Sequence, residues 1–296
     1  MRHRQEETSY VLITAAHNEE AYIDKTLLSV VHQTQLPVRW IIVDDASEDG
    51  TAAIVRQYEK QYPFIELLSL NDRHARDFSS KVFALNAGAA LLEGHQYAFV
   101  GHLDADVSFQ PEYMSSLIDR LQADQKLGLA GGFIHEEQGG EYRPRPMNSV
   151  RSVAGAIQMF RRECYESLNG FSPLRYGGED WHAEVRARMG GWRVVAFPEL
   201  AVHHLRPTGS AGKGRLRYWY LQGYKDYSLG SHPGFEAVKM ARRMLCRPYI
   251  IGALAGLVGF GLAYCRRENR LVSPEFLRFL RAEQMDRLRL FRSPSQ

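Results

Sequence analysis

The chain has 296 residues, of which 45% are hydrophobic and 24% charged, and this composition argues against disorder along its whole length. Its three cysteines are scattered without CxxC spacing, which argues against a disulfide framework or zinc site and fits a reducing compartment. From Arg206 onward the chain has 17 Lys and Arg and 6 Asp and Glu, a net charge of +11. The preceding residues have a net charge of −8. A basic C-terminal region on an acidic body predicts an anionic partner, either a membrane surface or a nucleic acid. The polar first residues lack the apolar core of a signal peptide, so we expect no secretion signal.

Apolar, β-branched runs alternate with segments of helical periodicity over the first hundred residues. The runs predict strands at 10–16, 40–43, 65–70 and 97–103. The periodic segments between them predict helices that start near 21, near 51 and at 79. Parallel strands need a helical crossover, so this alternation predicts a mixed, mostly parallel α/β sheet flanked by helices. In such sheets ligands bind at the carboxyl ends of the strands.

Asp104 and Asp106 follow the fourth predicted strand with one residue between them. Residues i and i+2 of an extended segment point to the same side, so both carboxylates can face one point in space. Two carboxylates that close repel each other unless a cation or a proton lies between them. Because hard divalent cations take oxygen ligands, the pair predicts a site for Mg²⁺ or Mn²⁺ and a diphosphate. The alternative is a strand-ending turn with two solvated aspartates.

The middle of the chain carries a helix at 112–121 and a strand at 127–133. The polar segment 136–146 is rich in Gly and Pro and predicts a loop at the mouth of the acceptor site. Further on, we predict a strand at 153–160, a short helix from 161, a helix that opens with Glu179 and Asp180, and a final strand at 191–198.

We divide the chain into a domain at 1–206 and a basic, helical extension at 207–296. The extension begins with a Gly-rich linker or lid and continues into aromatic residues beside Lys and Arg, as at a membrane interface. Segment 248–265 is uncharged and has arginines on both sides, which favours interfacial or re-entrant apolar helices over a full crossing. A buried soluble helix or a dimer interface is the alternative. Residues 274–291 predict an amphipathic, basic helix.

Four ordered motifs, at 14–20, 43–51, 84–88 and 104–106, closely resemble those of the family 2 glycosyltransferases, and the resemblance extends over about residues 9–206. It implies the GT-A fold, a nucleotide-diphosphate sugar donor, favoured as the UDP or GDP type, and inversion at the anomeric carbon. Single addition is expected, because the Gln-x-x-Arg-Trp signature of processive members is replaced here by the sequence of 215–219.

The resemblance also implies roles for residues on the donor side. It places the nucleoside against the end of the first strand, and against Asp44 or Asp45, whose alternative role is an Asp-Ser turn that caps a helix. The implied nucleotide- and donor-binding residues are Ala15, His17, Glu19, Asp44, Asp45, Lys81, Asn86 and Asp104. Lys81 would neutralise the diphosphate or would be a solvated surface lysine. Asp104 and Asp106 would either bind the metal together, or Asp106 would bind the metal alone while Asp104 holds the ribose or sugar of the donor.

On the acceptor side, the resemblance makes Asp180 the general base and gives Glu179 a supporting role. The alternative is that both carboxylates are simply favoured at a helix N-terminus by its dipole. Trp181 and His182 are expected to contact the acceptor, although Trp181 is equally suited to core packing. The resemblance further suggests a histidine as metal ligand, with His204 preferred to His203.

Together with this resemblance, the sequence predicts an inverting glycosyltransferase of bacterial cell-surface glycan or polysaccharide synthesis that acts by metal-assisted single displacement. It would be peripheral or monotopic on the cytoplasmic face of the cell membrane, with a glycan or lipid-linked acceptor. The uncharged run argues against nucleic acid as a partner, and the C-terminal helices offer a surface for homo-oligomers. Two alternatives remain: a nucleotidyltransferase acting on a sugar phosphate, whose usual basic Gly-rich loop is missing, or a non-catalytic, sugar-nucleotide-binding membrane adaptor.

Overall fold

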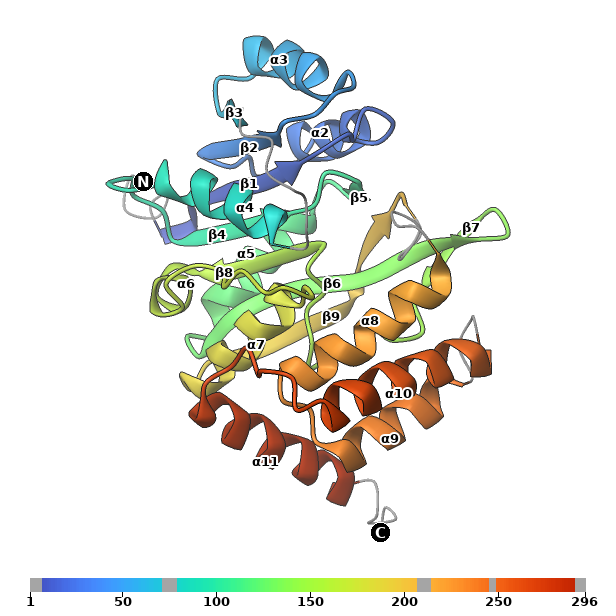
Figure 1. Cartoon of the computed structure of the whole chain (residues 1–296). Helices are drawn as coiled ribbons and strands as arrows, with labels where there is room; N and C mark the ends of the chain where they lie inside the picture. The colour runs from blue at the N-terminus through green and yellow to red at the C-terminus, as the bar shows by residue number, and fades with distance from the viewer. Residues whose placement is uncertain (1–6, 71–78, 207–213, 245–248, 291–296) are drawn as a thin grey trace. The chain divides into compact units, whose positions relative to one another are not determined.

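The computed structural model describes residues 7–70, 79–206, 214–244 and 249–290 (Figure 1). The chain forms two compact units, which are described separately. The first contains the residues up to Pro173 and the segment that starts at Glu179, and the second contains Leu174–Gly178 and the chain after residue 207. Most of the predicted lid at 207–214 lies outside the described residues.

In its described residues, the first unit is built on a nine-stranded sheet with the spatial order β3-β2-β1-β4-β8-β6-β9-β5, and β7 pairs with β6. Its strands are β1 (Tyr10–Ala16), β2 (Arg39–Asp45), β3 (Ile65–Leu70), β4 (Phe99–Leu103), β5 (Val107–Phe109), β6 (Leu127–Gln138), β7 (Glu141–Pro144), β8 (Ile157–Arg161) and β9 (Arg193–His204). The first four in spatial order are parallel, β8 runs antiparallel between β4 and β6, and β6 is parallel to β9. The predicted mixed, mostly parallel α/β sheet is confirmed.

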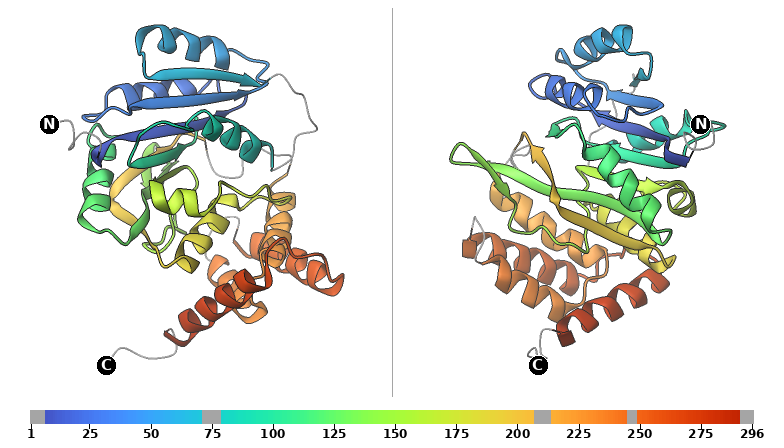
Figure 2. Two further views of the ribbon diagram at one scale, coloured as in Figure 1. Left: turned by 90° about the vertical axis from the view of Figure 1, so that its left-hand side faces the viewer. Right: turned by 180° about the vertical axis from the view of Figure 1, so that it is seen from behind.

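Helices cover both faces of this sheet, because successive residues of a buried strand point to opposite faces. The helices are α2 (Ile23–Val31), α3 (Thr51–Gln61), α4 (Ser80–Ala90), α5 (Tyr113–Ala123), α6 (Arg162–Ser167) and α7 (Glu179–Met189). Tyr10 and Leu12 of β1 belong to a core with α2, α3 and α5, whereas Val11 and Ile13 belong to a second core with α4, α6 and α7. In Figure 1 α4 lies in front of the sheet, and α5 comes to the front when the molecule is seen from behind (Figure 2).

Three segments differ from the sequence-based expectation. The segment predicted as a loop at 136–146 forms a β6–β7 hairpin, because Gly139 and Gly140 adopt the positive φ angles that a two-residue turn requires. The strand expected from residue 153 starts only at Ile157, since backbone groups before it bond to side chains of α7. Strand β9 continues past 198 as far as His204, because it pairs with both β5 and β6 there.

The second unit consists of α8 (Arg215–Ser228), α9 (Pro233–Arg243), α10 (Tyr249–Cys265) and α11 (Pro274–Leu290). Segment 248–265 therefore forms one continuous helix within its described residues, where apolar helices in the plural were expected. Helices α8 and α10 approach backbone to backbone: a Cβ on Gly223 would lie 2.1 Å from the carbonyl oxygen of Gly256. In the described part of the chain, we find no helix that combines the length and the apolar character needed to cross a membrane.

A buried ion network joins α8 to α9. The ammonium of Lys239 lies 2.6 Å from Asp226 and 2.8 Å from Glu236. Burial, reinforced by the charge of Asp226, raises the pKa of the Glu236 carboxyl to about 7, although Lys239 opposes this shift. The hydroxyl of Ser231 donates to Glu236 and accepts from the amide of Gln284, so the network also reaches α11.

Because α8 and α10 approach so closely, a side chain at Gly223 should lower the stability of the chain. Gly223→Ala would force the two helices apart, and overpacking of this kind typically costs about 1–3 kcal/mol in the free energy of unfolding. Gly261→Ala is the matched control, since a Cβ there meets no atom within 4 Å. It should stabilise α10 by about 0.5–1 kcal/mol, because Gly is a poor helix former. Urea unfolding of the full chain measures both, and equal effects of the two substitutions would contradict the packing argument.

Candidate active site

The loops after β1 and β2 are joined by hydrogen bonds at the carboxyl edge of the sheet. Nδ1 of His17 lies 2.7 Å from the carbonyl oxygen of Asp45, and the N–H of Asn18 donates to the hydroxyl of Ser47. Asn18 has a φ of +54°, a conformation that Asn tolerates better than most residues. The two loops thus form one surface from residues far apart in the sequence.

Four residues predicted to hold the nucleoside lie at these two strand ends. Ala15 is half-buried and pairs with Val43 of β2. The carboxylate of Asp44 is buried and accepts a hydrogen bond from the N–H of Ser47, while Asp45 is half-buried. Asp44 therefore shapes the turn after β2, and Asp45 and His17 are more accessible.

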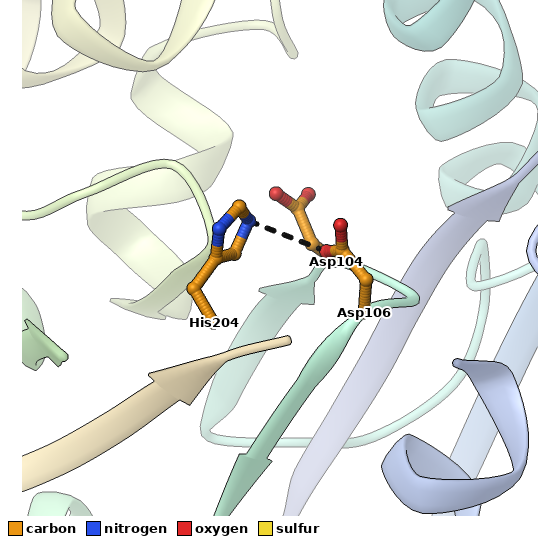
Figure 3. A group of neighbouring side chains, drawn as sticks. All are labelled: Asp104, Asp106 and His204. Carbon is orange, nitrogen blue, oxygen red and sulfur yellow. Dashed lines mark ion pairs between the residues drawn. The ribbon is translucent and has the colours of Figure 1, made fainter. Parts of the chain in front are cut away.

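Asp104, Asp106 and His204 come together at the ends of β4 and β9 (Figure 3). Antiparallel pairing of β5 with β9 sets Val107 opposite His204, which brings the imidazole beside the turn that carries both aspartates. Nε2 of His204 lies 3.4 Å from Oδ1 of Asp106, and one potential ligand atom from each of the three residues lies within 4.8 Å of the others. Two carboxylates and one imidazole at this spacing fit a divalent cation.

Asp106 and His204 shift each other's pKa in opposite directions. Burial would raise the pKa of Asp106, but the hydrogen bond and charge of His204 lower it overall. Burial would likewise lower the pKa of His204, yet Asp106 raises it overall. Nδ1 of His204 is buried and makes no hydrogen bond to the described residues. His203 contacts other residues, since its ring stacks on Tyr142 with centroids 4.3 Å apart.

Arg206 is a member of the site that sequence reasoning missed. Its guanidinium forms an ion pair with Glu19, and its Nε lies 3.6 Å from Oδ2 of Asp106. Burial raises the pKa of Glu19 to about 7; Arg206 opposes the shift, and the charge of Asp106 adds to it. Glu19, predicted to bind the nucleoside, thus lies toward the Asp106 side. Arg206 is two residues after His204, and this closeness in sequence to a predicted metal ligand is the signal that could have identified it.

Lys81 connects the aspartate group to the start of α7. Its Nζ lies 2.5 Å from Oδ1 of Asp104, and it lines a small pocket together with Asp104, Glu179 and Asp180. Burial would lower the pKa of Lys81, but the carboxylates of Asp104 and Glu179 raise it well above its usual range. Lys81 is therefore cationic and lies between carboxylates from two elements.

Asp180 is held at the N-terminus of α7. Its Oδ2 accepts a hydrogen bond of 3.1 Å from the N–H of Gly155, and its Oδ1 accepts from the N–H of Trp181. Trp181 is half-buried. His182 is buried, and this burial, with the charge of Arg186, lowers the pKa of its imidazole to about 4. Of the two predicted acceptor contacts, Trp181 is the more accessible.

Two further residues, Asn86 and His102, lie near these elements. Asn86, predicted to bind the donor, donates from Nδ2 to the carbonyl oxygen of Phe171 and does not line the pocket. His102 does line it, although an imidazole within an apolar strand gave no functional signal. Its two ring nitrogens are buried without hydrogen-bond partners among the described residues, and burial lowers its pKa to about 3. The neutral imidazole packs against aromatic rings, with the Phe171 ring centroid at 4.5 Å.

Comparison with known proteins gives consistent results. The family model described as "Glycosyl transferase family 2" matches residues 11–185. Glycosyltransferase AglE of Haloferax volcanii is 25% identical over 233 residues, which cover 71% of this chain and 74% of that protein. Mannosyltransferase PcManGT from Pyrobaculum calidifontis, solved with GDP-Man and Mn²⁺, gives a TM-score of 0.60 at 22% identity, covering 95% of this chain and 80% of its own.

A second solved structure, TarS of S. aureus in complex with UDP-GlcNAc, gives a TM-score of 0.54 at 16% identity, covering 92% of this chain and 78% of its own. These likenesses confirm the GT-A fold. Because the family model spans more than half of the residues, the chain belongs to glycosyltransferase family 2.

Proposed function

We propose that this chain moves a sugar from a nucleotide-diphosphate sugar to an acceptor hydroxyl in a single, inverting displacement. One observation carries the proposal: Asp104 and Asp180 line the same pocket, with the ammonium of Lys81 between their elements. An in-line displacement needs positive charge at the leaving diphosphate and a base at the attacking hydroxyl. Lys81 and Arg206 supply fixed positive charge, and Asp180 is the base, with Glu179 beside it.

For the donor, we propose a nucleotide sugar of the UDP or GDP type. Two structural neighbours were solved with donors of these types, GDP-Man in one and UDP-GlcNAc in the other. The joined loops after β1 and β2 offer carbonyl, imidazole and carboxylate groups for a nucleoside, from Ala15, His17, Asp44 and Asp45. The diphosphate then lies toward Asp104 and Lys81, and the acceptor approaches from the side of Asp180 and Trp181.

We further propose that Asp104, Asp106 and His204 hold Mn²⁺ or Mg²⁺. When bound, the cation would offset the negative charge that develops on the leaving diphosphate. Mg²⁺ prefers oxygen ligands, so the imidazole nitrogen of His204 favours Mn²⁺. The mutual contacts of Asp106 and His204 keep both ligand groups in place before a cation arrives. Binding requires the neutral imidazole, because a protonated nitrogen cannot donate its lone pair.

The adjacent histidines give a matched test of the metal site. His204→Ala should weaken Mn²⁺ binding, measured by calorimetry with UDP or GDP present, at least about tenfold, since loss of even an outer-shell partner costs that much. His203→Ala should leave binding unchanged, because that ring stacks on Tyr142 instead. Equal affinities of the two variants would contradict the assignment of His204.

The base assignment has its own test. Asp180→Asn keeps the shape of the side chain but cannot take the acceptor proton, so transfer should fall by about 10²–10⁴-fold. Donor affinity, measured by calorimetry, should be preserved. The anomeric configuration of the product, read by proton NMR, should be opposite to that of the donor. Retained configuration, or full transfer by the variant, would exclude Asp180 as the base of an inverting reaction.

For location, we propose the cytoplasmic face of the cell membrane, where a lipid-linked or glycan acceptor of cell-surface glycan synthesis would be met. The support comes from the second unit. One side of α10 packs through Gly252, Ala253, Gly256 and Phe260. The other side exposes a row of apolar side chains, each 38–61% exposed: Tyr249, Ile250, Ile251, Leu254, Val258 and Leu262.

Basic side chains accompany this apolar row. Arg266 and Arg267 are exposed directly after α10, and Arg242 is exposed on α9. An apolar helix face with nearby arginines suits an anionic membrane surface, where the apolar side chains enter the acyl boundary and the cations meet lipid headgroups. A second copy of the chain is the alternative occupant of this face.

Vesicle flotation distinguishes these occupants. The double variant Ile251→Asp, Leu254→Asp should lose most of its binding to vesicles that contain anionic phospholipid, because charged side chains resist entry into the interface. Val38→Asp, at an apolar residue of similar exposure (55%), is the control and should float like the wild type. Unchanged flotation of the double variant would rule out α10 as the anchor, and a loss of dimers in sedimentation would identify a second copy instead.

A further inference from the structure

Glu184 is a buried carboxyl group to which the proposed reaction gives no role. It lies on α7 and is 1% exposed. Its Oε1 accepts hydrogen bonds from the hydroxyl of Ser152 at 3.1 Å and from the N–H of Val153 at 2.8 Å. Its Oε2 lies 3.4 Å from the guanidinium of Arg188. Burying a carboxyl group is costly unless its oxygens are paired, and these contacts supply the partners. The presence of a carboxyl group at this buried position therefore needs a reason.

Asp180 is fastened to the same loop by a second bond. It lies four residues before Glu184, on the same side of α7. The N–H of Gly155 donates to Oδ2 of Asp180 at 3.1 Å. This approach requires glycine, since a Cβ at residue 155 would lie 2.6 Å from that oxygen. Two carboxyl groups one helical turn apart therefore hold one short loop, 152–155.

The loop leads directly to the aspartate group. The carbonyl oxygen of Ala156, the next residue, accepts a hydrogen bond of 2.9 Å from the N–H of Asp104. Strand β8 then begins at Ile157, which pairs with Leu103 of β4. Segment 152–156 is thus a backbone connection between α7, which carries the proposed base, and the turn that carries Asp104.

We propose that Glu184 is a positioning residue that anchors segment 152–156 and thereby holds the carboxylate of Asp180 in register with Asp104. The inference rests on the proposed function, because it assumes that Asp180 acts as the base. If the anchor is lost, the N–H of Gly155 moves away from Asp180, whose carboxylate is then free to turn. A displacement of about 1 Å at a reacting group can cost about 10²-fold in rate.

The protonation of Glu184 suggests a conservative variant. Burial raises the pKa of its carboxyl to about 8, with Arg188 opposing the shift and Asp180 adding to it. At neutral pH the group therefore carries a proton for much of the time, and glutamine is its isosteric neutral mimic. Glu184→Gln keeps an oxygen that accepts from Ser152 and Val153, whereas Glu184→Leu fills the same space and accepts from neither.

The experiment compares these variants in the full chain, with concentrations normalised to folded protein. Glu184→Leu should lower kcat for transfer by about 10–100-fold and leave the donor KM and the Mn²⁺ affinity unchanged. Glu184→Gln should restore most of kcat, as expected if the accepting oxygen rather than the charge is what matters. Glu166→Leu is the matched control: Glu166 also pairs with an arginine four residues away, but on α6, and should keep full activity.

Each other outcome overturns the inference. Wild-type kcat in Glu184→Leu would exclude a positioning role, and an equal loss in Glu184→Gln would show that the charge acts instead. A raised donor KM would place Glu184 in donor binding. If Glu184→Leu does not fold, Ser152→Ala removes one of the anchoring bonds alone, and its kcat should fall at unchanged KM. An inactive Asp180→Asn together with a fully active Glu184→Leu would refute this inference while the proposed function stands.

Discussion

Repulsion between carboxylates is the constraint around which the first unit is arranged. One edge of the sheet collects the carboxyl groups of Glu19, Asp104, Asp106, Glu179 and Asp180. Such a cluster is unfavourable unless cations lie among its members. The chain supplies them from elements that are remote in sequence: Lys81 on α4 and Arg206 after β9. The imidazole of His204, at the end of β9, contacts Asp106 as well. The fold is therefore stable with the site formed, and a dication with a diphosphate would enter among groups already placed for charge compensation.

The second unit depends on a different constraint, the close packing of its helices. Glycines let α8 and α10 approach at backbone distance. Phe260 and Ala263 of α10 are buried in one cluster with Tyr224 and Tyr227 of α8. The side of α10 away from α8 is left as a row of exposed aliphatic side chains. In water such a row is unfavourable and needs a cover. The buried Lys239 network meanwhile ties α9 to α8, which keeps the helices in one arrangement whatever covers the row.

Much of the first unit could be predicted, because its strands are long apolar runs and its helices are strongly periodic. The grouping of His204 with Asp104 and Asp106 rested on the family resemblance, and the β5–β9 pairing that creates it cannot be read from residue spacing. Side-chain contacts were harder still. Asn86 lies within a recognised motif yet bonds to Phe171, since local sequence does not reveal which neighbour an amide finds. Hydrophobic pattern could not foresee the β6–β7 hairpin, whose turn depends on two glycine φ angles.

The late start of β8 links the proposed base on α7 to the turn that carries Asp104. Residues 153–156 have the small, apolar character of a strand, yet their backbone does not continue the sheet ladder as far as residue 153. Buried backbone groups must find partners, and here they find the carboxyl groups of α7 and the N–H of Asp104. A regular strand would have satisfied the same groups without touching α7. Because the strand starts late, backbone hydrogen bonds of this segment link α7, which carries Asp180, to the turn that carries Asp104. A reaction that needs a base and a leaving-group site at fixed separation gives a physical reason for that choice.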